Sequence, residues 1–140
     1  MTIVDNKESL TSIMKSALLP LIDRSDFLLV FLFGSFAKEC FTNESDVDVA
    51  IMFERVPDFY EVSDLKDRMS SHIGRDVDIL VLNTASPIIK LQVLKYGQLI
   101  KKDEKVYNDF FVCTLNEYSD LKYLRREAED SILAGRRYAR

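Results

Sequence analysis

Two aspartates separated by one residue, Asp46 and Asp48, open an apolar run that continues to Phe53. Residues two apart in a strand point to the same face, so the two carboxylates would lie side by side. Neighbouring carboxylates share either a proton or a cation, and their oxygens suit hard ions such as Mg²⁺. The pair alone is equally consistent with a capped turn followed by a solvated strand residue.

A Gly-Ser pair precedes these aspartates. Gly34 and Ser35 directly follow the apolar run 27–33. Glycine lets a ligand approach the backbone, and the start of a following helix presents free N–H groups to an anion. The Ser35 hydroxyl would add another donor. This arrangement is typical of phosphate binding, although Gly-Ser is also a common turn.

A second acidic pair, Asp76 and Asp78, stands before the apolar residues 79–82. If the two acidic strands are neighbours, one carboxylate of this pair would face Asp46 and Asp48. Three carboxylates can hold two metal ions about 3.5–4 Å apart, which stabilise the attacking and leaving oxygens of a displacement. The third carboxylate could also orient or deprotonate an acceptor hydroxyl. Since aspartate is disfavoured inside strands, the set indicates metal-assisted phosphoryl or nucleotidyl transfer.

Helices and strands must position these residues, and the hydrophobic pattern predicts where they lie. Continuous apolar runs of strand length predict buried strands, and an apolar spacing of three or four predicts helices. We expect strands at 27–33, 47–53, 77–82 and 98–101, and helices at 7–22, 36–41, 59–73, 86–96 and 105–134. This order predicts an α+β (α/β) fold, a small mixed β-sheet flanked by helices, in one domain spanning residues 1–140.

Composition excludes several classes of protein. With 47% hydrophobic residues, 30% charged residues and a net charge of −4, the chain is typical of a globular protein without a broad basic face. We therefore expect no direct nucleic-acid or membrane binding. The two cysteines are too few for a disulfide framework, and the N-terminus does not read as a signal peptide. We expect a cytoplasmic protein.

Arginines nevertheless gather toward the C-terminus. They could complement the dipole at a helix end, or they could form a docking surface for an acidic partner. The sequence leaves both interpretations open for Arg125, Arg126, Arg136, Arg137 and Arg140.

The spacing of Gly34-Ser35, ten residues, then Asp46-Val47-Asp48 matches a G-S-x10-D-x-D signature. With it the chain resembles the DNA polymerase β-like nucleotidyltransferase superfamily. In its small size the chain is similar to members of the minimal nucleotidyltransferase (MNT) branch. Members of this branch act as antitoxins beside HEPN ribonuclease toxins. Residues 77–87 and 109–140 are also similar to that branch. The resemblance implies a polymerase β-like fold with a long C-terminal helix.

The resemblance also implies roles for individual residues. Gly34 and Ser35 would hold the triphosphate of ATP, the co-substrate. Asp46, Asp48 and Asp78 would be the catalytic carboxylates and would bind Mg²⁺. Asp78 would in addition serve the acceptor hydroxyl.

Two positions keep alternatives open at this site. Asp78 is preferred to Asp76 because Val77-Asp78 aligns with the Val-Asp at the start of the corresponding strand in the family. Glu39 stands where the family often has glycine, five residues after Gly34, and would change the rim of the phosphate site.

The activity implied by the resemblance is transfer of AMP from ATP to a tyrosine hydroxyl of a cognate HEPN toxin, with release of pyrophosphate. This modification would neutralise the toxin, and the two proteins would form a hetero-oligomer. One alternative is a catalytically weak fold that neutralises the toxin by binding alone. Another is a small-molecule nucleotidyltransferase that modifies an aminoglycoside-like acceptor.

Overall fold

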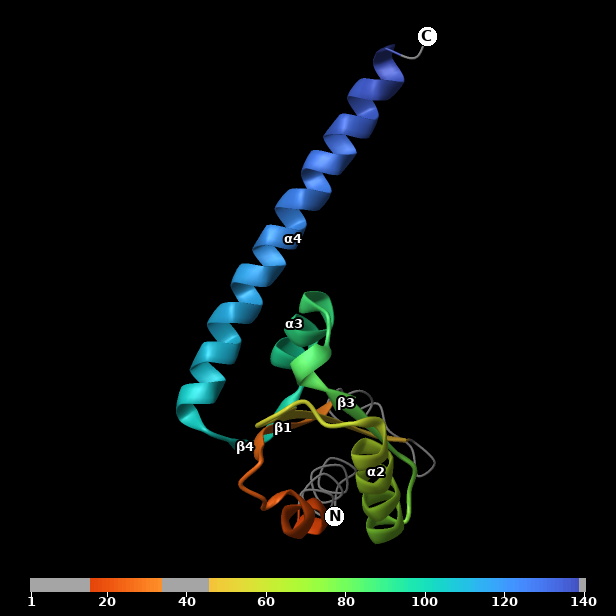
Figure 1. Ribbon diagram of the computed structural model, residues 1–140, viewed down its shortest axis with the longest axis vertical. Coiled ribbons are helices and arrows are strands. Elements are labelled where there is room, and N and C mark those ends of the chain that lie inside the picture. The colour runs from red at the N-terminus through yellow and green to blue at the C-terminus, as the bar shows by residue number, and fades with distance from the viewer. Residues whose placement is uncertain (1–15, 34–45, 139–140) are drawn as a thin grey trace, which may run out of the picture.

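The computed structural model, which describes residues 16–33 and 46–138, contains a four-stranded mixed sheet with helices on both faces (Figure 1). The strands are ordered β3-β2-β1-β4. Strand β1 runs antiparallel to β2 and β4, whereas β2 and β3 are parallel. The strands span Phe27–Phe33 (β1), Val47–Phe53 (β2), Val77–Val81 (β3) and Gln98–Lys102 (β4).

Helices cover both faces of this sheet. Figure 1 shows α2 together with the helical residues 16–22 on one side of the strands, and α3 with the start of α4 on the other. The bounds are Phe59–Ile73 for α2, Pro87–Tyr96 for α3 and Glu104–Tyr138 for α4, with a short 3₁₀ helix η1 at Leu82–Thr84. The expected mixed sheet flanked by helices is therefore confirmed.

Alternate residues of β1 and β2 pack into two separate cores. One core joins Val30, Val49 and neighbouring strand residues to Leu65 and Met69 of α2. The other joins the opposite faces of the strands to α3 and α4. Because both faces are buried, these strands need apolar residues at nearly every position, which is the pattern that predicted them.

Local signals set the bounds of α2 and α3. The Asp58 side chain accepts a hydrogen bond from the Glu61 N–H at 2.8 Å, and Gly74 ends α2 with a φ of 78°. Ser86 caps α3, accepting from the Ile89 N–H at 3.3 Å, with Pro87 at the first position. These are the usual start and stop signals of helices, and both predicted helices are confirmed.

Leu82 differs from prediction, because the third strand ends at Val81 and Leu82 begins a 3₁₀ helix that ends at Thr84. The amide of Asn83 bonds to Phe53 twice: its Oδ1 accepts from the backbone N–H and its Nδ2 donates to the carbonyl, each at 2.9 Å. Two bonds to the end of β2 turn the chain away from strand geometry. The predicted helix 36–41 and the beginning of the helix 7–22 lie outside the described residues.

Helix α4 extends well beyond the packed part of the fold (Figure 1). Phe110 and Thr114 are buried, but every residue from 119 to 134 is exposed. The helix is 35 residues long, about four residues longer at its C-terminal end than the predicted bound of 134. No helix in the described part of the chain is both long and apolar enough to cross a membrane.

Candidate active site

The candidate site lies where the parallel strands β2 and β3 begin. Asp48 is paired in register with Asp78, and Val47 with Val77. Both valines are fully buried, so the two carboxylates point to the opposite face of the sheet, the face covered by α3 and α4. The two acidic strands are therefore neighbours, which is the condition under which the sequence allowed a shared carboxylate site.

Two hydrogen bonds fix the start of β3 against its surroundings. The Val47 N–H donates to the Asp76 carbonyl at 2.9 Å, which joins β3 to β2. The Val77 N–H donates to Ser70 Oγ at 3.0 Å, which joins β3 to α2. The backbone beside Asp78 is therefore held from both sides.

The charges at this end of the sheet are not balanced. Burial raises the pKa of Asp48 above its ordinary value, and the carboxylates of Asp78 and Asp46 raise it further. Asp48 is partly buried, whereas Asp46 and Asp78 are exposed. A cation between the strands would relieve this repulsion.

The carboxylates fit a Mg²⁺ ion that takes most of its ligands from elsewhere. Within residues 16–33 and 46–138, no group of three or more His, Cys, Asp or Glu side chains is arranged to hold a metal ion by itself. Mg²⁺ commonly uses one or two carboxylates and completes its coordination with water and phosphate oxygens. The paired Asp48 and Asp78 match that requirement.

A lysine from α2 reaches the same site. Lys66 Nζ lies 3.3 Å from Oδ1 of Asp78, and both side chains are about half exposed. Lys66 is not among the residues that the sequence predicted for the site. Its contact joins a helix to a strand, and no local pattern in the sequence indicates it.

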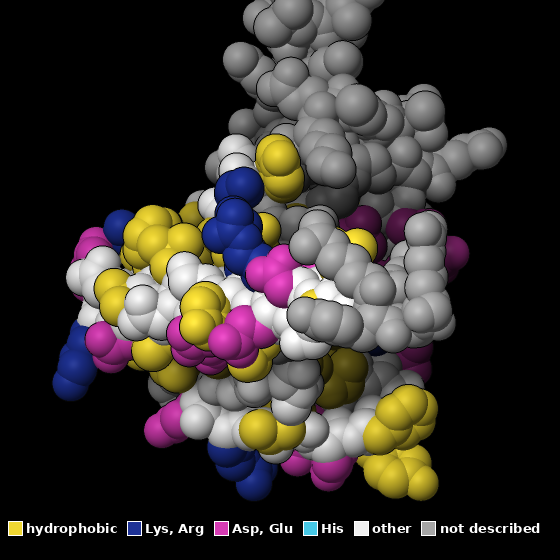
Figure 2. Space-filling model, turned by 90° about the horizontal axis from the view of Figure 1, so that it is seen from above, with side chains coloured by type: hydrophobic (Ala, Val, Ile, Leu, Met, Phe, Trp, Pro, Cys, Tyr) yellow, Lys and Arg dark blue, Asp and Glu magenta, His cyan; other side chains and the backbone are white. Residues whose placement is uncertain are grey.

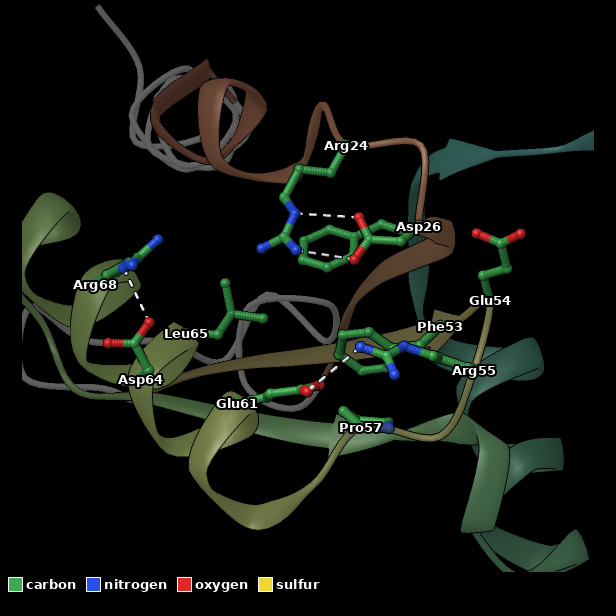
Figure 3. A pocket seen from close by; sticks show the side chains of 11 residues that line it. Arg24, Asp26, Phe53, Glu54, Arg55, Pro57, Glu61, Asp64, Leu65 and Arg68 are labelled. Carbon is green, nitrogen blue, oxygen red and sulfur yellow. Dashed lines mark hydrogen bonds and ion pairs between the residues drawn. The ribbon is translucent and has the colours of Figure 1, made fainter.

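A surface pocket of about 350 Å³ lies at the opposite end of β1 and β2 (Figure 3). Each of its three arginines pairs with an acidic neighbour: Arg24 with Asp26 at 2.9 Å, Arg55 with Glu61 at 3.6 Å and Arg68 with Asp64 at 3.0 Å. The pocket is therefore separated from the carboxylates by the length of the strands, and its arginines are already paired.

Charges of both signs lie on the face of the molecule seen from above in Figure 2. In the view of Figure 2, acidic and basic side chains are interspersed and the hydrophobic ones form small separate groups. On α4, Arg125 pairs with Glu129 at 3.2 Å. Arg125 is thus partly neutralised within its own helix, and a docking role for the C-terminal arginines stays a prediction.

Comparison with known proteins identifies the family. The family described as polymerase beta, nucleotidyltransferase matches residues 20–106, which include both acidic strands. The chain belongs to this nucleotidyltransferase family. The resemblance inferred from the G-S-x10-D-x-D spacing is thereby confirmed.

Among curated relatives, the nucleotidyltransferase is similar to protein adenylyltransferase MntA of Shewanella oneidensis. The two are 27% identical over 106 residues, which cover 76% of each chain.

Solved structures share the fold. One, a toxin–antitoxin with AMP-PNP, has a TM-score of 0.75 at 24% identity, over 85% of this chain and 98% of the other. Another, a tri-AMPylated Shewanella oneidensis HEPN toxin in complex with MNT antitoxin, gives 0.71 at 22% identity, over 88% and 98%. These similarities confirm the polymerase β-like fold with its long C-terminal helix.

The predicted site residues of this nucleotidyltransferase fall into two groups. Asp46, Asp48 and Asp78 gather at one end of the β2–β3 pair. Gly34 and Ser35, as well as Glu39, lie outside the described residues. Local spacing singled out Asp46 and Asp48, whereas the preference for Asp78 over Asp76 came from the family resemblance. Lys66, which contacts Asp78, was not predicted.

Proposed function

We propose that this nucleotidyltransferase is a protein adenylyltransferase that acts as an antitoxin. It transfers AMP from ATP to a tyrosine hydroxyl of a cognate HEPN ribonuclease toxin and so neutralises the toxin. The main structural support is the register of Asp48 and Asp78, which sets two carboxylates side by side in a nucleotidyltransferase fold. The similarity to MntA and to structures of toxin–antitoxin complexes supports the substrate and the partner.

In this proposal the three carboxylates hold Mg²⁺. Asp46 directly precedes β2, Asp48 is its second residue, and Asp78 is the second residue of the paired strand β3. The bound ions would neutralise charge that develops on the phosphates during transfer. Gly34 and Ser35 hold the triphosphate.

The reaction breaks the α–β phosphoanhydride bond of ATP and forms a phosphoester bond to tyrosine. The tyrosine oxygen attacks the α-phosphorus of ATP, the bond to the bridging α–β oxygen breaks, and pyrophosphate leaves. The proton of the tyrosine hydroxyl passes to a carboxylate, for which Asp78 is our candidate. In this proposal the protein acts in the cytoplasm and binds neither nucleic acid nor membrane directly.

Intact mass of the candidate toxin tests this function. The protein encoded beside this one is incubated with this chain, ATP and Mg²⁺, and its mass is expected to rise in steps of one AMP. Asp48→Ala should remove the gain while the two proteins still co-elute on a sizing column. A stable complex with no gain in mass would favour neutralisation by binding alone, and AMP on an aminoglycoside instead would favour the small-molecule enzyme.

A further inference from the structure

We propose that Lys66 is a positioning residue of the nucleotidyl-transfer site, acting as a counterion that holds Asp78 while the divalent cation is absent and yields that carboxylate when the cation binds. The inference rests on the proposed function, because it concerns the metal carboxylates of that site. It adds a residue from α2 that is outside the G-S-x10-D-x-D signature.

Lys66 belongs to a helix on one face of the sheet but contacts a carboxylate that points to the other face. Helix α2 packs through Leu65 and Met69 on one face, whereas Asp48 and Asp78 point to the other. Strand β3 is at the edge of the sheet, so a long side chain can pass around it. Lys66 does so, and its Nζ lies 3.3 Å from Asp78 Oδ1.

The packing of α2 fixes where this lysine can reach. Ser70 stands one helical turn after Lys66 and therefore on the same side of α2. Its Oγ accepts from the Val77 N–H at 3.0 Å, at the residue directly before Asp78. Met69, beside Ser70, is fully buried in the core. The helix is thus tied to β3 next to the carboxylate that Lys66 contacts.

The charges explain what this contact does. Asp46 and Asp78 both repel the Asp48 carboxylate at the start of β2 and β3, and the Lys66 ammonium pairs with Asp78. A divalent cation bound by Asp78 occupies the same region of negative potential, so ammonium and cation compete for one carboxylate. Phosphates that arrive with the cation offer the released ammonium a new anionic partner. Lys66 therefore weakens the binding of metal alone and strengthens the binding of metal with nucleotide.

Calorimetric titration of the full chain with Mn²⁺, in the absence of nucleotide, tests directly whether Lys66 and the cation compete for Asp78. Mn²⁺ suits carboxylate ligands and stands in for Mg²⁺. We expect Lys66→Met to bind Mn²⁺ about two- to fivefold more tightly, the factor that corresponds to an exposed ion pair of up to about 1 kcal/mol. Lys66→Arg keeps the positive charge and should bind Mn²⁺ as the unsubstituted protein does.

Lys102→Met is a matched control for loss of a paired lysine. Lys102 pairs with Glu104 at 2.9 Å and lies on β4, the strand at the other edge of the sheet. Its removal should leave the Mn²⁺ affinity unchanged. Lys66→Met should also raise the KM for ATP, and Lys66→Arg should restore the original KM. Loss of a lysine with only a structural role would not combine a higher KM for ATP with tighter binding of the metal.

The outcomes separate this inference from the proposed function. Equal Mn²⁺ affinity in Lys66→Met and the unsubstituted protein, or weaker affinity in the variant, would overturn the counterion role and leave the transferase proposal standing. If the unsubstituted protein binds no Mn²⁺, or binds it equally after Asp48→Ala, the metal site of the proposed function fails, and the role of Lys66 fails with it.

Discussion

Asp48 and Asp78 lie side by side on one face of a parallel strand pair, each directly after a valine that is fully buried. The buried valines fix the register of the two strands, and this register brings the two carboxylates together. Core packing therefore maintains an electrostatic arrangement that is unfavourable in the absence of a cation.

The first prediction concerns the stability of the metal-free protein as pH changes. Because the pKa of Asp48 is raised in the folded state above its ordinary value of 3.8, the folded protein binds this proton more tightly than the unfolded chain does. The resulting stability is full below the ordinary pKa and is lost as pH rises through the raised one. Urea unfolding in chelator should therefore show Asp48→Asn gaining stability over the unsubstituted protein as pH rises from about 4 to 7.

Addition of Mn²⁺ provides the control for this effect. The cation should stabilise the unsubstituted protein at pH 7 and have a much smaller effect on Asp48→Asn. A stability difference between the two proteins that does not vary with pH would contradict the assigned repulsion.

The second prediction concerns the bond between α2 and β3. Ser70→Ala leaves the Val77 N–H without its acceptor and should lower the free energy of unfolding by about 1–2 kcal/mol. AMP transfer should also slow, because the backbone beside Asp78 loses one of its two attachments. Ser71→Ala, at the exposed next position, is the control and should change neither quantity. Unfolding in urea and the rate of gain in toxin mass measure both effects.

How far the sequence determines this site can be seen in particular residues. Strands 27–33 and 47–53 were predicted with their observed bounds because burial on both faces requires unbroken apolar runs. The carboxylates of β2 were found through local spacing. From the sequence alone, the approach of Asp78 to these carboxylates depended on the two strands being neighbours, and the order of strands depends on the whole fold.

Contacts between distant elements escaped prediction for the same reason. Asn83 closes onto Phe53 across 30 residues of sequence, and Lys66 reaches Asp78 around a sheet edge. Neither contact has a periodic or motif signal. The roles of Gly34 and Ser35 stay predictions.

The third prediction concerns Asn83. Asn83→Ala removes both hydrogen bonds to the Phe53 backbone and should lower the free energy of unfolding by about 1–3 kcal/mol, because a partly buried donor and acceptor lose their partner. Asn108→Ala, on the exposed side of α4, should change it by less than about 0.5 kcal/mol. Equal effects of the two substitutions in urea unfolding would show that the amide does not hold the end of β2.

The fourth prediction separates the packed and the projecting parts of α4. Phe110 is only 6% exposed, and Phe110→Ala should cost about 3–5 kcal/mol of stability. Leu124 is 60% exposed, so Leu124→Ala should cost less than about 0.5 kcal/mol in the isolated protein. Thermal or urea unfolding compares them. A large loss from Leu124→Ala would mean that the projecting half of α4 is packed in solution.

The fifth prediction decides between Asp78 and Asp76 as the third carboxylate. Asp78 pairs in register with Asp48 and raises its pKa, whereas Asp76 precedes β3 and joins β2 through its backbone carbonyl. Asp78→Asn should therefore slow AMP transfer by about 10²–10⁴-fold, the range typical of a lost acid–base group. Asp76→Asn keeps the backbone carbonyl that joins β2, and its rate of AMP transfer should fall far less. Single-turnover gain in toxin mass at saturating ATP measures both rates, and a greater loss from Asp76→Asn would transfer the role to that residue.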